Sequence, residues 1–144
     1  MQIRLMARLM AFDYGSKRLG IAVSDPLQII ATSLTTIHPK DCITFLNTYL
    51  ASEVVSCFIV GEPRQIDNTL SETAGQANAF VKLLNKNFPL IPVKRINERM
   101  TSQLAMRSLI DSGVKKMERR NKALLDSVSA TIILQVYMES IEGK

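Results

Sequence analysis

The fold of this chain is decided by residues 9–25, which read Leu9-Met10-Ala11-Phe12-Asp13-Tyr14-Gly15-Ser16-Lys17-Arg18-Leu19-Gly20-Ile21-Ala22-Val23-Ser24-Asp25. Two apolar runs flank a Gly/Ser/Lys turn, and this pattern predicts a β-hairpin. Alternate residues of a strand point to opposite faces of the sheet, so Asp13 departs from the apolar pattern near the turn. A carboxylate held there is costly unless it binds a cation or a proton donor. An Asp that caps its own turn is the alternative interpretation.

Two later carboxylates favour the interpretation that Asp13 binds a cation. Glu98 follows the short β-type run 91–97, and Asp126 lies in the first turns of the final predicted helix, beside its apolar stripe. Three acids at the ends of three elements can meet at one edge of a sheet and bind divalent metal through hard oxygen ligands, although spacing alone leaves this open. The candidate catalytic residues and ligands of Mg²⁺ or Mn²⁺ are therefore Asp13, Glu98 and Asp126. Asp13 is the expected bridge between two ions, because a strand residue is the most rigidly placed of the three.

Four separated blocks carry a family resemblance. They read FDYGSKRLGIAVSD (12–25), IVGEP (59–63), NERMTS (97–102) and LDSVSATIILQ (125–135). In these blocks, and in their order over residues 8–138, the chain resembles the YqgF (RuvX) family. Its members are bacterial RNase H-like proteins, described as Holliday junction resolvases and as nucleases that mature the small-subunit ribosomal RNA precursor.

The resemblance implies an RNase H-like fold and a hydrolase that cleaves phosphodiester bonds in structured nucleic acid. Processing of the 16S ribosomal RNA precursor is the favoured function, and resolution of branched DNA at Holliday junctions is the alternative. Two positions depart from the family pattern. Asn97 stands where the family often has Asp, which removes a charge beside Glu98, and Asn68 stands where the family often has Gly. Asn tolerates the left-handed conformation better than other residues with a side chain, so the second change is mild.

The charge balance favours a polyanionic partner. The 144 residues hold 18 Lys plus Arg against 13 Asp plus Glu, a net charge of +5. The stretch 115–122 holds five bases and one acid just before Asp126, which suits phosphate contact beside an acidic metal site. The candidate nucleic-acid contacts are Arg18, Arg64, Arg99, Lys115, Lys116, Arg119, Arg120 and Lys122. A solvated linker and ordinary surface charges are the alternative interpretation of these residues.

Composition also excludes several classes of protein. No run approaches a membrane span, and Arg4 and Arg8 interrupt any signal-type apolar core at the N-terminus. Cys42 and Cys57 lack metal-ligand spacing, so we expect reduced, buried thiols in a cytoplasmic protein. His38 is the only histidine, which argues against His-dependent triads and zinc sites.

Periodicity predicts one α/β domain spanning residues 1–144, because the sequence contains no linker, repeat or low-complexity tract. Strands are expected over 8–14, 18–25, 28–37, 54–61 and 92–97, and helices from Pro39, from Thr69, over 101–112 and over 123–138. The first three strands form an antiparallel meander. The resemblance supplies the remaining arrangement, an RNase H-like five-stranded mixed sheet with two parallel strands, flanked by helices.

Two rival functions fit part of this pattern. Actin-like ATPases and sugar kinases also use a strand-Asp-x-Gly hairpin, but they need a second such hairpin and an adenosine motif, which this sequence lacks. A non-catalytic nucleic-acid-binding module explains the basic stretch but leaves the three acids unexplained. The residues leave open RNA versus DNA, endo- versus exonuclease action, the choice of metal, and monomer versus homodimer. Tyr14 is interpreted as a packing residue rather than a base-stacking one.

Overall fold

The computed structural model describes residues 7–62, 74–97 and 122–142. Its elements in chain order are β1 (Arg8–Tyr14), β2 (Leu19–Ser24), β3 (Ala31–Ile37), the 3₁₀ turn η2 (Pro39–Asp41), α1 (Cys42–Leu50), β4 (Val55–Glu62), α2 (Ala74–Asn87), β5 (Val93–Asn97) and α5 (Lys122–Glu142). The predicted helix over 101–112 and the helix start at Thr69 lie outside the described residues.

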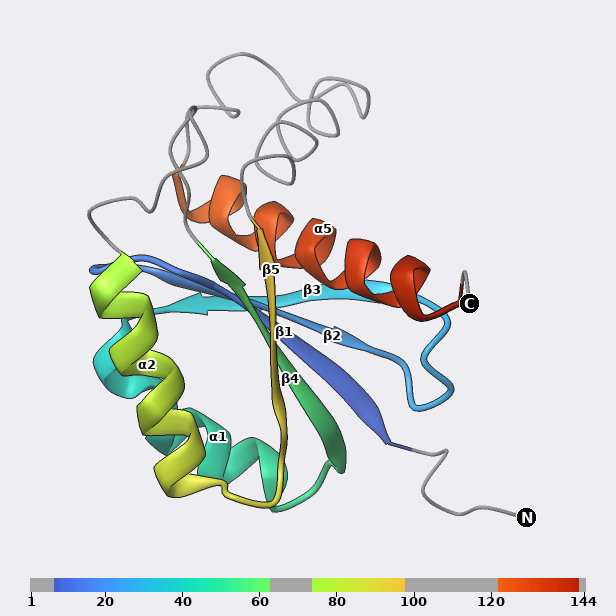
Figure 1. Cartoon of the computed structure of the whole chain (residues 1–144), viewed down its shortest axis with the longest axis horizontal. Coiled ribbons are helices and arrows are strands. Elements are labelled where there is room, and N and C mark those ends of the chain that lie inside the picture. Colours follow the sequence, from blue (N-terminus) through green and yellow to red (C-terminus); the bar gives the residue numbers. More distant parts are fainter. Residues whose placement is uncertain (1–6, 63–73, 98–121, 143–144) are drawn as a thin grey trace.

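The five strands form one mixed sheet in the order β3-β2-β1-β4-β5, with β1 at its centre (Figure 1). β1 pairs antiparallel with β2, which pairs antiparallel with β3. β4 pairs in parallel with β1 on one side and with β5 on the other. The predicted meander with two added parallel strands is confirmed.

Each face of the sheet is covered by helices, because β1, β2 and β4 bury side chains on both sides. On one face, here called the α2 face, the core includes Met10, Phe12, Leu46, Phe58 and Phe80. On the other, the α5 face, the core includes Leu9, Ala11, Ala22, Ala130 and Ile133. Figure 1 shows α1 and α2 on one side of the sheet and α5 across the other. Consecutive residues of β1 therefore belong to different cores, as the two-residue period requires.

The third strand begins later than predicted, at Ala31 rather than Gln28. An Asp25 carboxylate oxygen accepts hydrogen bonds from the backbone N–H groups of Ile29 and Ile30, at 2.7 and 2.8 Å. Gln28 takes a positive φ of 61° within this turn. The carboxylate thus satisfies backbone donors that would otherwise have joined the strand ladder.

The ends of two helices also differ from expectation. The segment opened by Pro39 starts as a 3₁₀ turn, and the α-helix begins at Cys42. His38 has a structural role there, because its Nδ1 accepts a hydrogen bond of 3.0 Å from the Lys40 backbone N–H. The final helix continues to Glu142, four residues past its predicted end.

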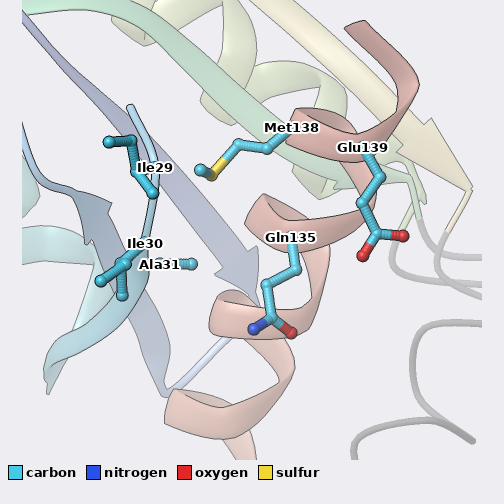
Figure 2. A pocket seen from close by; sticks show the side chains of 6 residues that line it. All are labelled: Ile29, Ile30, Ala31, Gln135, Met138 and Glu139. Carbon is cyan, nitrogen blue, oxygen red and sulfur yellow. The ribbon is translucent and has the colours of Figure 1, made fainter. Parts of the chain in front are cut away.

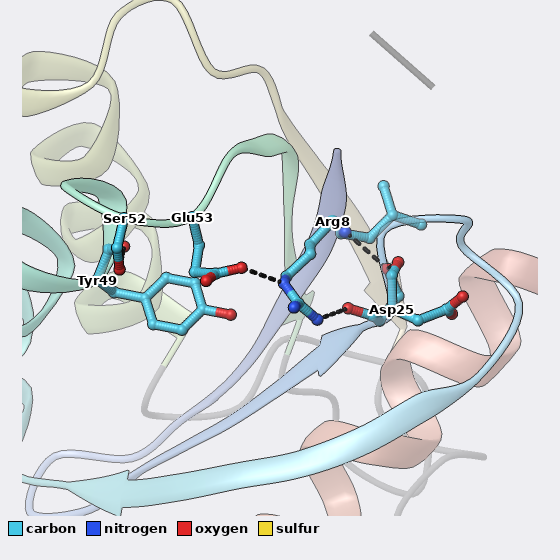
Figure 3. A network of polar contacts seen from close by, with 7 residues as sticks. Arg8, Asp25, Tyr49, Ser52 and Glu53 are labelled. Carbon is cyan, nitrogen blue, oxygen red and sulfur yellow. Dashed lines mark hydrogen bonds and ion pairs between the residues drawn. The ribbon is translucent and has the colours of Figure 1, made fainter. Parts of the chain in front are cut away.

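A polar network fastens the start of β1 (Figure 3). Arg8 Nε donates to Glu53 Oε1 at 2.8 Å, and its Nη1 donates to the Ser24 carbonyl at 3.0 Å. The Leu9 backbone N–H donates to Ser24 Oγ at 2.9 Å. The hydrogen bond to Glu53 raises the pKa of Arg8. This network stabilises the N-terminal end of β1, which lies about 20 Å from the C-terminal end of the same strand.

Candidate active site

The three parallel strands end at one edge of the sheet. β1, β4 and β5 run in the same direction, with Phe12 beside Val60 and Glu62 beside Asn97. The first turns of α5 lie over this edge (Figure 1). In open α/β sheets the crevice outside the carboxyl ends of the strands is the usual ligand site. This edge is where the sequence analysis expected the acids to meet.

Asp13 is half-buried at this edge, on the α5 face. It shares that face with Leu9 and Ala11 by the alternation of β1. In the antiparallel pairing it lies opposite Gly20, and on the parallel side Gly61 follows the partner of Phe12. The neighbouring positions on both adjacent strands thus carry no side chain. At these positions, therefore, no side chain of β2 or β4 stands directly beside Asp13.

The hairpin that follows Asp13 is tight. The Gly15 backbone N–H donates to the Arg18 carbonyl at 2.9 Å. A Cβ on residue 15 would lie 2.9 Å from the same oxygen, so the turn requires glycine here. The half-buried Arg18, one of the candidate phosphate contacts, is therefore held on the same hairpin as Asp13.

Asp126 belongs to α5, one turn before Ala130. Ala130, Ile133 and Leu134 are buried against the α5 face of the sheet. The helical repeat places position 126 in the same row as these residues, at the end of α5 that reaches the edge. The structure thus brings the Asp126 position and Asp13 to the same face and the same edge.

Most of the other predicted site residues lie outside the residues that the structure describes. Glu98 comes directly after β5, which ends at Asn97 on this edge, and is itself outside the described residues. Lys122 is the first residue of α5. The remaining basic candidates outside the described residues are Arg64, Arg99, Lys115, Lys116, Arg119 and Arg120.

The donor set at this edge suits a hard divalent cation. Asp13 offers carboxylate oxygens on a rigid strand, between two glycine positions, and Mg²⁺ and Mn²⁺ prefer such oxygen ligands. Among the side chains that the structure describes, no group of three His, Cys, Asp or Glu residues is close enough to hold a metal. The side chains of Glu98 and Asp126 are not among them.

Arg95 is a candidate that the sequence analysis missed. It lies in β5 beside Val60, and its Nη1 donates to Asn78 Oδ1 of α2 at 3.1 Å. Within the described part of the chain its Nε and Nη2 are buried and have no hydrogen-bond partner. The sequence contains one signal for it, because Arg95 shares the α2 face with Val93 two positions earlier, which is partly buried against the core.

Two pockets lie on opposite faces of the sheet. The pocket on the α2 face has a volume of about 380 Å³ and is lined by Tyr14, Pro39, Lys40, Gln76, Ala79, Phe80 and Leu83. The Tyr14 ring packs 5.1 Å from the Phe80 ring, so Tyr14 is a packing residue as predicted. The pocket on the α5 face, of about 290 Å³, is lined by Ile29, Ile30, Ala31, Gln135, Met138 and Glu139 (Figure 2). It lies along the C-terminal half of α5, away from Asp13.

Neither cysteine is suited to nucleophilic chemistry. Both are free and buried, as predicted. Burial raises the pKa of the Cys42 thiol to about 12, and burial also raises the pKa of Cys57. A thiol that stays protonated at neutral pH is a poor nucleophile.

Comparison with known structures defines the class of the fold. RuvC of Thermus thermophilus in complex with a Holliday junction substrate superposes with a TM-score of 0.55 at 18% identity, covering 93% of this chain and 96% of that one. A second Thermus thermophilus RuvC structure gives a TM-score of 0.56 at 15% identity, covering 94% and 96%. The mixed sheet with its flanking helices is thus the RNase H-like fold of RuvC. In this chain the carboxylate of Asp13 lies near the end of the central strand β1.

Sequence comparison is more specific. The RuvX family, described as Holliday junction resolvase, matches residues 7–140. A Bacteroides thetaiotaomicron protein named "Putative pre-16S rRNA nuclease" is 50% identical over 135 residues, covering 94% of this chain and 98% of that protein. A Christiangramia forsetii protein of the same name is 47% identical over 133 residues, covering 92% and 98%. The chain belongs to the RuvX family.

Proposed function

We propose that this chain is a divalent-metal-dependent nuclease that cleaves phosphodiester bonds in structured nucleic acid, and that the 16S ribosomal RNA precursor is its substrate. The observation that carries the proposal is the position of Asp13, between Gly20 and Gly61 at the edge where three parallel strands end and α5 begins. The names of the relatives support the substrate.

Asp13, Glu98 and Asp126 are the proposed metal ligands. Bound Mg²⁺ or Mn²⁺ supplies an activated water and stabilises charge on the attacking and leaving oxygens. Asp13 contributes rigidity, because its strand is hydrogen-bonded on both sides. Asp126 approaches from α5, which is anchored on the sheet by Ala130 and Ile133. The chain's part is to hold carboxylates of fixed geometry around one phosphate.

Arginine and lysine side chains around this edge are proposed to hold the polyanion. Arg18 lies on the hairpin of Asp13, and Arg99 directly follows Glu98 in sequence. Arg64 and the basic stretch 115–122 add positive charge. Phosphate contacts of this kind position a substrate without reading its sequence.

The cleavage test uses purified protein with precursor 16S rRNA and, separately, with a four-way DNA junction, in Mn²⁺ or EDTA. Asp13→Asn, Glu98→Gln and Asp126→Asn should each abolish Mn²⁺-dependent cleavage of the rRNA and leave the fold intact by circular dichroism. The control Asp41→Asn removes an exposed acid from η2 and should cleave normally. Full activity of Asp13→Asn would remove the site assignment. Cleavage of the junction alone would favour the resolvase function, and binding without cleavage would favour a non-catalytic module.

The role of the basic stretch is tested by the salt dependence of binding. Each phosphate contact with duplex contributes about −0.9 to the slope of log K against log salt. Replacing Lys115, Lys116, Arg119 and Arg120 by Ser should therefore flatten the slope by up to roughly 3 to 4 units. An unchanged slope would rule out phosphate contact by this stretch.

The cellular setting is part of the same proposal. None of the described helices is long and apolar enough to cross a bilayer. We place the enzyme in the cytoplasm, acting as one domain of residues 1–144 on the ribosomal small-subunit precursor.

A further inference from the structure

The guanidinium of Arg95 is held in one orientation beneath the surface of the α2 face. Arg95 pairs with Val60 in the parallel ladder, and Val93, two positions earlier in β5, packs against the core of that face. Asn78, an exposed residue of α2, accepts a hydrogen bond of 3.1 Å from Nη1. One end of the guanidinium is therefore fixed by the helix above it.

The opposite edge of the same group has unmet donors. Nε and Nη2 have no partner among the described residues, and both atoms are shielded from solvent. Buried polar atoms are nearly always hydrogen-bonded, so an exception calls for a physical explanation. The exception is most costly for a charged group, because charge adds to the desolvation penalty.

The two unmet donors share a chemically specific geometry. Nε–H and the Nη2 amino group lie on one edge of the planar guanidinium and point in parallel, which matches two oxygens of a phosphate or carboxylate. Arg95 is itself half-buried rather than fully buried. Side-chain rotamer changes are common at binding surfaces, and the proposal requires one that opens Nε and Nη2 to an anion.

We propose that Arg95 is a phosphate-binding residue. Its Nε and Nη2 donate hydrogen bonds to one backbone phosphate of the substrate, and Asn78 positions the guanidinium. The choice of a nucleic-acid phosphate rests on the proposed function. β5 is two strands from β1, so the Cα of Arg95 lies roughly 10 Å from that of Phe12, which precedes Asp13. Because Asp13 lies on the α5 face and Arg95 on the α2 face, a strand that contacts both would have to cross the edge of the sheet.

The first experiment measures thermal unfolding in EDTA, with and without inorganic phosphate, against chloride at matched ionic strength. Arg95→Met keeps most of the side-chain length and removes the unmet donors. It should melt at or above the wild-type temperature in phosphate-free buffer. Phosphate should raise the melting temperature of the wild type more than that of Arg95→Met. Lys86→Met removes the same charge from an exposed position of α2 and should match the wild type.

The second experiment measures binding of a labelled single-stranded RNA by fluorescence anisotropy in EDTA. Loss of a hydrogen-bonded charged contact should weaken binding about ten- to 150-fold in Arg95→Met. The salt slope should fall by about 0.7, which is the contribution of one contact with a single strand. Arg95→Lys should restore the slope but only part of the affinity, because an ammonium lacks the planar fork.

Three results would overturn the assignment. A melting temperature of Arg95→Met several degrees below wild type, with equal protection of both by phosphate, would show that the guanidinium is satisfied within the protein. Selective phosphate protection with unchanged RNA affinity would show that the anion is not the substrate backbone. Equal RNA binding by Arg95→Met and Lys86→Met would reduce Arg95 to a general surface charge. Both readouts are made without cleavage, so an inactive wild type would count against the proposed function and not against this site.

Discussion

Replacing Ala130 by Leu should separate the stability of the fold from the geometry of the candidate site. Ala130 has no exposed surface and lies in one cluster with Ala11 and Ala22, where α5 approaches the sheet. Leu adds three carbon atoms at this contact, and overpacking of this kind costs about 1–3 kcal/mol. At roughly 2–4 °C per kcal/mol for a chain of this size, the melting temperature should fall by about 2–12 °C.

The larger effect should be on cleavage. Position 126 lies four residues before Ala130, about 6 Å along the helix axis, so in the proposed site a helix lifted at Ala130 also moves Asp126 away from Asp13. A misplacement of about 1 Å can cost roughly 100-fold in rate, or about 2.7 kcal/mol in the barrier. The assay is single-turnover cleavage of precursor rRNA in Mn²⁺, at a temperature where circular dichroism shows both proteins fully folded.

The matched control is Met138→Phe. Met138 belongs to the same cluster and is 5% exposed, but it lies eight residues beyond Ala130, about 12 Å further from the site. Met138→Phe alters packing in the same cluster and should keep its cleavage rate, whatever stability it loses. Equal rates for Ala130→Leu and Met138→Phe would refute the argument that α5 sets the position of Asp126.

Three further predictions concern pH, thiol chemistry and metal. The hydrogen bond from the Ile30 N–H lowers the pKa of Asp25, so its stabilisation is present above its unfolded pKa of about 3.9 and is lost as the pH falls through the folded pKa. Chemical denaturation should show a gap between wild type and Asp25→Ala at neutral pH that closes in acid; a constant gap would contradict this. Cys42 should not react with an aromatic disulfide at pH 8 until the protein unfolds, because burial raises its pKa to about 12, and fast native reaction would be inconsistent. Asp126→Asn should melt above wild type in EDTA yet gain less from Mn²⁺, since like charges repel without metal, and equal Mn²⁺ shifts would exclude Asp126 from the site.

Much of the fold was predictable because its signals are local. β1 was predicted with its observed bounds, since its two-residue alternation and the following Gly15 turn are encoded within ten residues. β4 was predicted to within one residue from a continuous apolar run that fits a strand covered on both faces. Asp13 lies outside the apolar pattern of β1, so its position near the turn is also encoded locally.

The structure differs from the sequence-based predictions where a side chain accepts the hydrogen bonds of backbone N–H groups. Gln28 to Ile30 have the composition of a strand, yet the Asp25 carboxylate captures two of their backbone N–H groups. His38 likewise accepts a backbone hydrogen bond at the start of a 3₁₀ turn, and the composition of that segment does not predict the turn. Such contacts depend on distances of about 3 Å, which propensity does not encode.

By itself the sequence determined the types of the elements, the meander, the apolar faces and the acids at element ends, because these follow from repeats of 2 and 3.6 residues. Only the tertiary structure decided what surrounds the candidate site. Gly20 and Gly61 come from different strands and become neighbours of Asp13 only through the order β2-β1-β4 and its register. Likewise, only the tertiary structure shows that Arg95 Nη1 meets Asn78 of α2 while Nε and Nη2 have no partner among the described residues. Strand order and helix placement are set by the burial of both faces at once, a property of the whole chain rather than of any local segment.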